Sequence, residues 1–352
     1  MTISPGAVIG IIGGGQLGRM LAMAAAQLGY KCHIFDPHES PPAADVAARF
    51  TRADFSNTNA LQAFGEAVDV ATYEFENLPV GPLEVLGAKL NPGTRSLAAA
   101  QDRAAEKRFV EGCGARVAAW RTVASLADVD AAVAELGTPV VLKTRRYGYD
   151  GKGQAWIREA AEASAAWEAI GAEPAIAESG VDFSAEFSVI IARWADGRHA
   201  FWDSAENEHR EGILRRSTVP SSDIVAGQVE EARKAALSIA EALGHVGVLT
   251  VEFFASASGP LVNEIAPRVH NSGHWTIEGA VTSQFEQHIR AICGVAPGDT
   301  ALVGGGAVMD NLIGDDVNRW PDLVAESGLH VHIYGKGESR PGRKMGHVTR
   351  VT

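Results

Sequence analysis

Apolar and polar positions follow one another along this chain in segments that predict an α/β fold. Short apolar runs, typical of strands buried in a sheet, occur at residues 7–12, 31–35, 68–73, 139–143 and 175–178. Helix-forming residues fill 16–28, 97–111 and the alanine-rich segment 160–169. A longer strand is expected at 184–193. Strands interleaved with helices in this order are typical of α/β proteins.

The most informative pattern is a pair of strands near residue 250. β-forming residues fill 247–254 and 261–265, and a polar turn separates them, which predicts an antiparallel hairpin. Each strand carries one carboxylate among apolar neighbours, Glu252 and Glu264. Because side chains alternate between the faces of a strand, a suitable register places both carboxylates on one face. Mg²⁺ would relieve their repulsion, since it takes carboxylates together with nucleotide phosphates. The alternative is two solvated glutamates.

A dense group of cationic and hydrogen-bonding side chains follows this hairpin. Asn263 adds an amide oxygen beside the second glutamate. The next segment then supplies Arg268, His270, Asn271, Ser272 and His274. A surface loop seldom needs such a density, so the pattern predicts a site, with an ordinary polar loop as the alternative.

The N-terminal apolar run ends in a glycine turn. Gly13, Gly15 and Gly18 have G-x-G-x-x-G spacing before a helix, and Asp36 ends the next strand. This is the order of a dinucleotide-binding fold, in which the acid would hold a ribose. The signal is weak, because glycine turns before helices also bind other phosphorylated ligands or only bring a helix close to a strand.

Two further segments carry candidate ligand-binding groups. Glu74 and Glu76 end the strand at 68–73, where open α/β sheets place their ligands, although solvated loop acids are an equal alternative. Residues 145–154, RRYGYDGKGQ, follow a strand that ends in Lys143. Backbone N–H groups and the ammonium of such a loop can wrap phosphates. The loop lacks the G-K-[ST] ending of Walker A.

Composition and charge narrow the class of protein. The chain has 352 residues, 46% of them hydrophobic, and a net charge of -12, which fits two or three globular domains. An acidic balance argues against nucleic acid or an anionic membrane as a partner. A local cluster near the C-terminus could still hold an anionic small molecule; it consists of Lys336, Arg340, Arg343, Lys344 and Arg350.

The cysteines and the N-terminal residues give no sign of a disulfide-rich, zinc-binding, secreted or membrane-spanning protein. Cys32, Cys113 and Cys293 lie far apart without CxxC spacing, so neither a disulfide framework nor a zinc site is expected. There is no basic region before the first apolar run and no apolar segment of about 18 residues. We therefore expect a cytoplasmic protein.

Seven motifs appear in a recognisable order: GGGQLGRM, DRAAEK, VLKTRRYGYDGKGQ, AESGVDFSAEFSV, NEHREGILRRS, NEIAPRVHNSGHW and YGKGESRPGRKMGH. Over nearly the whole length, the chain resembles the 5-(carboxyamino)imidazole ribonucleotide synthases, ATP-grasp carboxylases of bacterial purine biosynthesis. GYDGKGQ and NEIAPRVHNSGHW are the most specific motifs. The resemblance implies an ATP-grasp fold with a Rossmann-like (pre-ATP-grasp) domain at 1–110, a small lid at 111–183 and a larger α+β domain at 184–352.

The resemblance also implies roles for individual residues. Catalytic roles would fall to Tyr149, Asp150, Arg268 and His270, and one or two Mg²⁺ ions to Glu252 and Glu264. ATP would contact Arg103, Lys143, Gly148, Tyr149, Asp150, Gly151, Lys152, Gly153, Gln154, Glu178, Ser179, Gly180, Val181, Glu186, His209, Asn263 and Glu264. The second substrate would contact Gly15, Gln16, Leu17, Glu76, Asn271, Ser272, Lys336, Arg343 and Lys344.

The implied activity is an ATP-dependent carbon–nitrogen ligation of EC class 6.3.4. ATP would phosphorylate bicarbonate to carboxyphosphate, which would carboxylate the exocyclic amine of 5-aminoimidazole ribonucleotide, directly or after release of CO₂, giving ADP and phosphate. Cations and a closed lid suit such a transfer. Arg268 would match the planar oxyanion, or alternatively pair with Glu264 or Glu278. A homodimer is also expected.

Two departures from the family and three competing functions bear on this interpretation. Tyr147 stands where many relatives have a glycine, which would stiffen the lid, and Ser179 where a lysine is frequent. A nicotinamide dehydrogenase would explain the glycine turn and Asp36 but not the paired glutamates or GYDGKGQ. The formate-dependent purine transformylases differ chiefly in the acid activated. A non-catalytic nucleotide sensor is disfavoured, because the acidic and cationic residues are intact.

Overall fold

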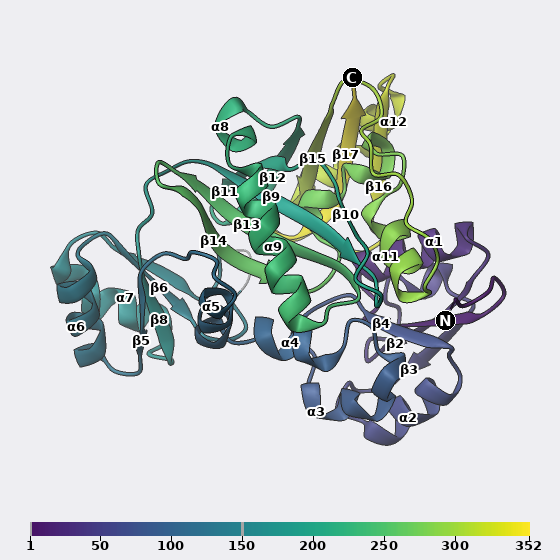
Figure 1. Cartoon of the computed structure of the whole chain (residues 1–352), viewed down its shortest axis with the longest axis horizontal. Coiled ribbons are helices and arrows are strands. Elements are labelled where there is room, and N and C mark those ends of the chain that lie inside the picture. The colour runs from purple at the N-terminus through teal and green to yellow at the C-terminus, as the bar shows by residue number, and fades with distance from the viewer. Residues whose placement is uncertain (1, 149–150) are drawn as a thin grey trace.

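The computed structural model describes residues 2–148 and 151–352, and within them three β-sheets form the framework of the molecule. A parallel four-stranded sheet near the N-terminus and an antiparallel four-stranded sheet flank a nine-stranded sheet, whose paired strands are also antiparallel. In Figure 1 the antiparallel four-stranded sheet, with α6 and α7, projects to the left, away from the rest of the chain. No helix among these residues is long and apolar enough to cross a membrane.

The N-terminal sheet has the strand order β3-β2-β1-β4, with all neighbours parallel. Its strands are β1 (Val8–Ile12), β2 (Lys31–Asp36), β3 (Arg49–Arg52) and β4 (Val70–Tyr73). The helices of this part are α1 (Gln16–Gln27), α2 (Thr58–Glu66), α3 (Val80–Leu83) and α4 (Thr94–Ala100). The strands expected at 7–12, 31–35 and 68–73 are β1, β2 and β4, and their ends are confirmed within two residues. Because these strands are parallel, their carboxyl ends lie at one edge of the sheet.

The small sheet has the order β5-β8-β6-β7, antiparallel throughout. Its elements are β5 (Trp120–Val123), α6 (Leu126–Leu136), β6 (Val140–Thr144), β7 (Gln154–Ile157), α7 (Ala163–Ala169) and β8 (Ala175–Ser179). Ser125 caps α6 by accepting from the Asp128 N–H. Both helices pack on one side of the sheet and form a separate hydrophobic core with it.

The large sheet runs β14-β13-β9-β11-β12-β15-β17-β16, with β10 paired to β9. Its strands are β9 (Phe183–Arg193), β10 (His199–Phe201), β11 (Ala205–Arg210), β12 (Ile213–Val219), β13 (Gly247–Ser256), β14 (Gly259–Ala266), β15 (Ala307–Ile313), β16 (Leu329–Ile333) and β17 (Lys344–Val351). The helices are α5 (Arg103–Gly112), α8 (Asp223–Ala226), α9 (Val229–Leu243), α10 (Thr276–Gly279), α11 (Gln284–Ile292) and α12 (Trp320–Ala325).

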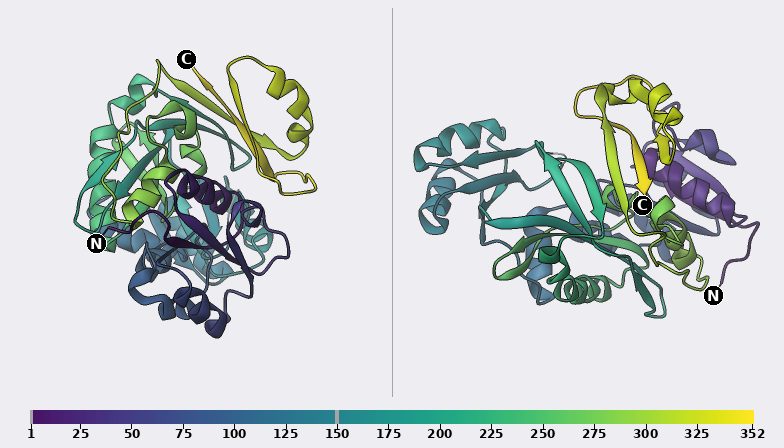
Figure 2. Two further views of the ribbon diagram at one scale, coloured as in Figure 1. Left: turned by 90° about the vertical axis from the view of Figure 1, so that its right-hand side faces the viewer. Right: turned by 90° about the horizontal axis from the view of Figure 1, so that it is seen from above.

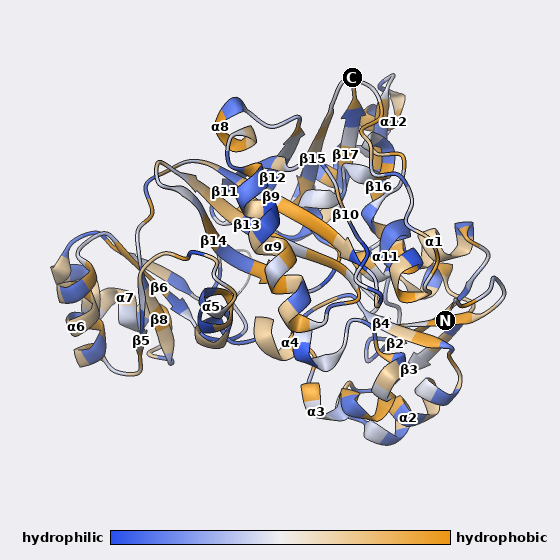
Figure 3. Cartoon of the chain, in the orientation of Figure 1, coloured by the Kyte–Doolittle hydropathy of each residue, from blue (hydrophilic) through white to orange (hydrophobic). Residues whose placement is uncertain are grey.

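Helices cover the central strands of the large sheet from both sides. Ala232, Ala236 and Ile239 of α9 pack with β9 and β13 in one hydrophobic core. Residues of α11 join α1 in another core, so the N-terminal part is fixed against the large sheet. Figure 3 shows hydrophobic residues on the central strands and hydrophilic ones on the outer sides of the helices. The N-terminal part and the large sheet are therefore packed together through shared cores. The small sheet stands apart from them (Figure 2).

Two expectations about local structure need correction. The single helix expected at 97–111 is two helices, α4 and α5, because Asp102 has extended backbone (φ -128°, ψ 113°) and caps α5 through the N–H groups of Ala104 and Ala105. The hairpin turn is also shorter than expected, since β13 and β14 extend to Ser256 and Gly259. We keep the domain boundaries after residues 110 and 183 as a proposal.

Candidate active site

Glu252 and Glu264 face each other directly across the ladder of β13 and β14. They are register partners, and the register shifts by one residue beside them, so Asn263 is the extra residue of a β-bulge. The alternation of side chains therefore does place both carboxylates on one face. Burial, and then the charge of Glu264, raise the pKa of Glu252 to about 7. Two carboxylates held this way form a natural site for a divalent cation.

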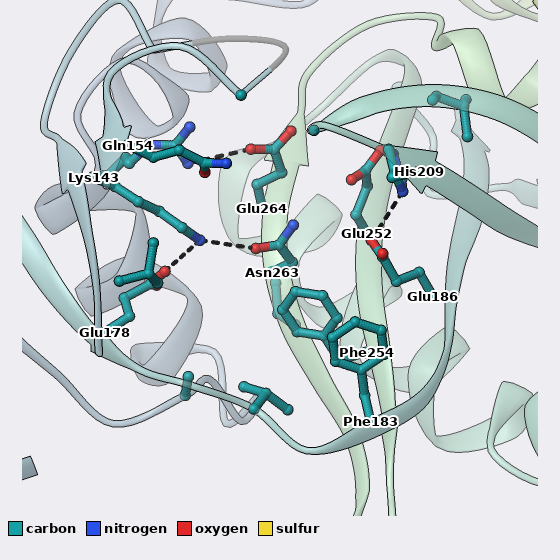
Figure 4. A pocket seen from close by; sticks show the side chains of 18 of the residues that line it. Lys143, Gln154, Glu178, Phe183, Glu186, His209, Glu252, Phe254, Asn263 and Glu264 are labelled. Carbon is teal, nitrogen blue, oxygen red and sulfur yellow. Dashed lines mark hydrogen bonds and ion pairs between the residues drawn. The ribbon is translucent and has the colours of Figure 1, made fainter. Parts of the chain in front are cut away.

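Cations from two other elements reach this hairpin. Arg103, in the first turn of α5, places Nη1 3.2 Å from Glu264 Oε2. Lys143, on β6 of the small sheet, donates from Nζ to Asn263 Oδ1 at 3.3 Å. Figure 4 shows Lys143 between Glu178 and Asn263, at the place where the small sheet faces the large one. Both cations were predicted to contact phosphates, and here protein oxygens compensate them.

Glu178 forms a buried ion-pair group with two lysines. Its Oε1 lies 2.6 Å from Lys107 Nζ and its Oε2 contacts Lys143 Nζ. Burial alone would raise the pKa of Glu178, but the ammonium groups of Lys143 and Lys107 hold it well below its usual range. The side chain of Glu178 thus fixes Lys143, in addition to the role expected of its backbone. Lys107 was missed as a site residue, although its position one turn after Arg103 was a signal.

A cavity beside the β13–β14 hairpin is lined by aromatic, acidic and imidazole groups. Phe183 and Phe254 stack with ring centroids 4.6 Å apart, and both line the cavity together with Glu178, Ser179, Gly180 and Val181. His209 Nδ1 lies 3.0 Å from Glu186 Oε2 (Figure 4). Burial would lower the pKa of His209, but the Glu186 hydrogen bond and the Glu252 charge raise it. The two phenylalanines were not among the predicted site residues.

The glycine-rich loop connects β6 to β7. Gly151 and Gly153 have φ values of 77° and 71°, in the left-handed region that favours glycine. A Cβ on Gly151 would lie 2.7 Å from the backbone oxygen of Glu211, so the loop passes close to the β11–β12 turn. Tyr147, at the position where the family resemblance led us to expect a glycine, also has a positive φ, 61°. The predicted catalytic residues Tyr149 and Asp150 lie outside the described residues.

The glycine turn before α1 binds a carboxylate of its own chain. Glu74 accepts the Gly15 N–H at 2.7 Å and the Gly18 N–H at 3.0 Å. Asp36 accepts the Gly14 N–H at 2.7 Å and also pairs with His38. The donors and the acid that a dinucleotide would need are therefore already used. Gly15, predicted to contact substrate, lines neither of the two cavities described below, whereas Gln16 and Leu17 do line one.

Arg268 and Glu76 pair with each other. Arg268 Nε contacts Glu76 Oε2, so the alternative partners considered for Arg268, Glu264 and Glu278, are not its ion-pair partners. Burial would raise the pKa of Glu76, but Arg268 holds it below its usual range. Glu278 instead pairs with His332 at 2.6 Å. Arg268 and Glu76, both predicted site residues, line one cavity together, so a ligand bound there could replace either partner of this ion pair.

The segment after Arg268 is held by a network of side chains. His270 Nε2 lies 3.3 Å from Glu252 Oε1, and its Nδ1 lies 2.8 Å from Ser272 Oγ. Asn271 exchanges two amide hydrogen bonds with Asn311. Ser272, predicted to contact substrate, is fully buried and lines neither cavity, and its hydroxyl is placed to orient His270.

Four basic residues near the C-terminus line a second, larger cavity. Lys336, Arg340, Arg343 and Lys344 border it together, and Arg340 was not in the predicted substrate set. Lys336 Nζ donates to the Lys344 carbonyl at 2.8 Å and lies over the Tyr334 ring. Arg343 Nη1 donates to the Glu338 carbonyl at 3.2 Å. Four of the five residues of the predicted cationic cluster therefore line this cavity, whereas Arg350 pairs with Glu326 outside it.

The two cavities adjoin at the β13–β14 hairpin. The first, of about 370 Å³, is lined by the predicted ATP residues apart from Gly148 and those outside the described residues. The second, of about 730 Å³, is lined by Gly148, Arg268, His270 and the predicted substrate residues other than Gly15 and Ser272. Residues common to both linings are Arg103, Lys152, Glu264, His270, Asn271 and Lys344.

Three family models match consecutive parts of the chain. They are a ribonucleotide synthetase preATP-grasp domain at residues 7–101, an ATP-grasp domain at 108–285 and a phosphoribosylaminoimidazole carboxylase C-terminal domain at 307–352. Among curated proteins, the N5-carboxyaminoimidazole ribonucleotide synthase of Brucella melitensis is 48% identical, over 99% of this chain and 98% of its own. The Bacillus subtilis protein of that name is 44% identical, over 99% and 92%.

Solved structures give the same relationship. The ADP complex of an N5-carboxyaminoimidazole ribonucleotide synthetase matches with a TM-score of 0.95 and 41% identity, over 100% of this chain and 94% of that one. The Aspergillus clavatus enzyme, in complex with ADP and 5-aminoimidazole ribonucleotide, matches with a TM-score of 0.92 and 27% identity, over 99% and 94%. The ATP-grasp fold with a preATP-grasp domain, expected from the motifs, is thereby confirmed.

Proposed function

Because the chain belongs to the N5-carboxyaminoimidazole ribonucleotide synthase family, we propose that it carboxylates 5-aminoimidazole ribonucleotide with ATP and bicarbonate. The products would be 5-(carboxyamino)imidazole ribonucleotide, ADP and phosphate, in an EC 6.3.4 ligase reaction of purine biosynthesis. The observation that carries this proposal is the pair of adjoining cavities, whose common wall contains Glu264, Arg103 and Lys344. A phosphoryl group could pass from one ligand to the other at that wall.

We assign ATP to the smaller cavity. Its adenine would lie between Phe254 and the backbone of 178–181, and the ribose hydroxyls near Glu186. The phosphates would extend toward Arg103, Lys143 and the loop at 151–154, whose N–H groups and cations suit them. Arg103 and Lys143 would stay compensated when ATP binds, because phosphate oxygens would replace the carboxylate and amide oxygens that these cations now contact.

Glu252 and Glu264 would hold Mg²⁺. Their direct opposition and the raised pKa of Glu252 fit a divalent cation. Within the described ranges there is no group of three or more His, Cys, Asp or Glu side chains placed to hold a metal alone. The other ligands would therefore come from nucleotide oxygens and water, as Mg²⁺ prefers. Bound there, the ion would neutralise charge that develops on the transferring phosphoryl group.

The larger cavity would hold 5-aminoimidazole ribonucleotide. Lys336, Arg343 and Lys344 would neutralise its phosphate, and Gln16, Leu17 and Glu76 would contact its other end. Arg268 would turn from Glu76 toward the bicarbonate or carboxyphosphate oxyanion. Its planar guanidinium would then hold the acid beside the common wall, where the exocyclic amine can attack.

The acid substrate distinguishes this function from that of the sister transformylases. ADP formation should be measured with ATP, Mg²⁺ and aminoimidazole ribonucleotide, with either bicarbonate or formate supplied in CO₂-depleted buffer. We expect bicarbonate to support ADP formation and formate not to. A preference for formate would assign the chain to the other activity. The homodimer and the cytoplasmic location stay predictions.

A further inference from the structure

β14, which carries the proposed metal ligand Glu264, is an edge strand of the large sheet. Its outer N–H and C=O groups have no neighbouring strand, and a buried backbone group without a partner is costly. At Val262 the segment after α5 covers this edge, where Val262 N–H donates to the Arg116 carbonyl at 2.7 Å. Beyond Val262, where the bulge places Asn263, the edge needs other partners.

Two consecutive side chains of α5 supply those partners. Lys107 Nζ donates to the Asn263 carbonyl at 2.8 Å. Glu106 Oε1 accepts the Ile265 N–H at 2.6 Å. One turn earlier, Arg103 contacts the Glu264 carboxylate. A single face of α5 therefore grips the main chain immediately before and immediately after the proposed metal ligand.

Burial shows that these contacts are not incidental surface pairs. Glu106 and Lys107 are each only 2% exposed, and a buried charge is costly unless it is compensated by hydrogen bonds or opposite charge. Lys107 pairs with Glu178 as well as with the strand. An apolar side chain could fill the same volume but could not satisfy the N–H and C=O groups of the edge.

We propose that Glu106 and Lys107 are positioning residues, which hold the Asn263–Ile265 main chain so that Glu264 stays opposite Glu252 for metal binding. This rests on the proposed function only in taking the two glutamates as metal ligands. Lys107 lines the smaller cavity and Glu106 the larger one, but the proposed role acts through the main chain of β14 and requires no contact with metal or substrate. Glu106 acts through the Ile265 amide, so its reach should matter more than its charge.

Two substitutions separate reach from charge. Glu106→Gln keeps an acceptor oxygen at the same distance and removes the charge, whereas Glu106→Asp keeps the charge and shortens the side chain by one methylene. Mn²⁺ binding to each variant with ADP would be measured by electron paramagnetic resonance, a readout that requires no carboxylation. Glu111→Asp, on the exposed end of the same helix, is the matched control.

We expect Glu106→Asp to weaken Mn²⁺ binding about tenfold, while Glu106→Gln and Glu111→Asp stay within about threefold of the parent. ADP affinity without metal should be the same in all four proteins. The proposal is overturned if Mn²⁺ affinity falls equally in Glu106→Gln and Glu106→Asp, if it falls more in Glu106→Gln, or if it falls in neither variant. Amide exchange in the parent gives a second test: Ile265 should be protected despite its edge position, and rapid exchange would contradict the proposal even where Glu106→Asp does not fold. Failure of carboxylation alone would affect only the proposed function.

Discussion

Glu252 lies directly opposite Glu264 on the β13–β14 ladder, with Asn263 bulged out between the paired positions of β14. The burial that raises the pKa of Glu252 would make this pair unfavourable as two bare anions. Arg103, which contacts Glu264, and the charges of His209 and Lys344, which act on Glu252, relieve part of that repulsion in the chain itself. A bound divalent cation would relieve the rest, which connects the fold of this hairpin to phosphoryl transfer.

The first prediction concerns the charge of Glu264. Glu264→Gln should lower ADP formation at saturating Mg²⁺ by at least about a hundredfold, because metal stabilisation of a transferring phosphoryl group contributes several kcal/mol. Circular dichroism and the thermal midpoint should change little, since the side-chain volume is kept. Glu111→Gln is the exposed control. Activity of Glu264→Gln within a few-fold of the parent would remove this residue from the metal site.

The second prediction concerns the basic wall of the larger cavity. Arg343→Ala and Lys336→Ala should each raise the KM for aminoimidazole ribonucleotide about tenfold, since a charged hydrogen bond contributes ~1.5 to 3 kcal/mol. The KM for ATP should hardly change. Arg350→Ala serves as control, because Arg350 pairs with Glu326 outside this cavity. A matched rise in the KM for ATP would show that the two substrates had been placed wrongly.

The third prediction separates this chain from the dehydrogenases. Fluorescence titration with NADH should detect no binding at millimolar concentration, because the Glu74 carboxylate already occupies the Gly15 and Gly18 N–H groups. A pyrophosphate brought to the same turn would be repelled by that carboxylate. Saturable NADH binding that is lost in Asp36→Asn would restore the dinucleotide interpretation.

The fourth prediction follows from two buried histidines that join the N-terminal part to the large sheet. His288 Nδ1 accepts the Val248 N–H at 3.0 Å, and its Nε2 lies 2.8 Å from Thr72 Oγ1. His245 Nε2 lies 2.9 Å from the Val248 carbonyl, and its Nδ1 lies 3.0 Å from Ser96 Oγ. Burial lowers the pKa of His288 to about 3 and that of His245 to about 4.

Because these pKa values are lowered in the folded state, the free energy of unfolding should decrease as the pH is lowered. The unfolded chain takes up protons below about pH 6.5, whereas the folded imidazoles stay neutral until pH 4 or lower, so stability is complete above pH 6.5 and decreases as the pH falls toward the folded values. Between pH 7.5 and 5, each imidazole should cost roughly 2 kcal/mol of unfolding free energy. Urea unfolding of His288→Asn should show a correspondingly smaller pH dependence, and that of exposed His199→Asn an unchanged one. Identical pH dependence in His288→Asn and the parent would contradict the assignment.

Sequence patterns predicted those features that depend on neighbouring residues. Alternation on β13 and β14 indicated that Glu252 and Glu264 share a face, and the register confirms it. The glycine turn indicated an anion at α1, and there is one, but it is Glu74 of the same chain, brought there by β4. Local spacing carries no information about that long-range pairing.

The partners of buried charges were the least predictable part of the site. Arg268 pairs with Glu76, which precedes it by 192 residues, and Glu106 reaches the Ile265 amide across 159 residues. Lys107 received no role from the sequence, and the structure encloses it between Glu178 and β14. Such contacts depend on how the sheets are packed together. Residue patterns named Arg268 and Glu76 as candidates without indicating that they pair, and neither pattern nor resemblance gave Glu106 a role.

The measurement that tests the central claim most directly is the release of ADP from four mixtures: complete, without bicarbonate, without aminoimidazole ribonucleotide, and without both. Each would contain ATP and Mg²⁺ in CO₂-depleted buffer. We predict rapid ADP formation in the complete mixture, with one 5-(carboxyamino)imidazole ribonucleotide per ADP when product is trapped at once, and strongly reduced ADP when bicarbonate is omitted. ADP formation that does not respond to bicarbonate, or that yields no carboxylated nucleotide, would contradict the proposed carboxylase function.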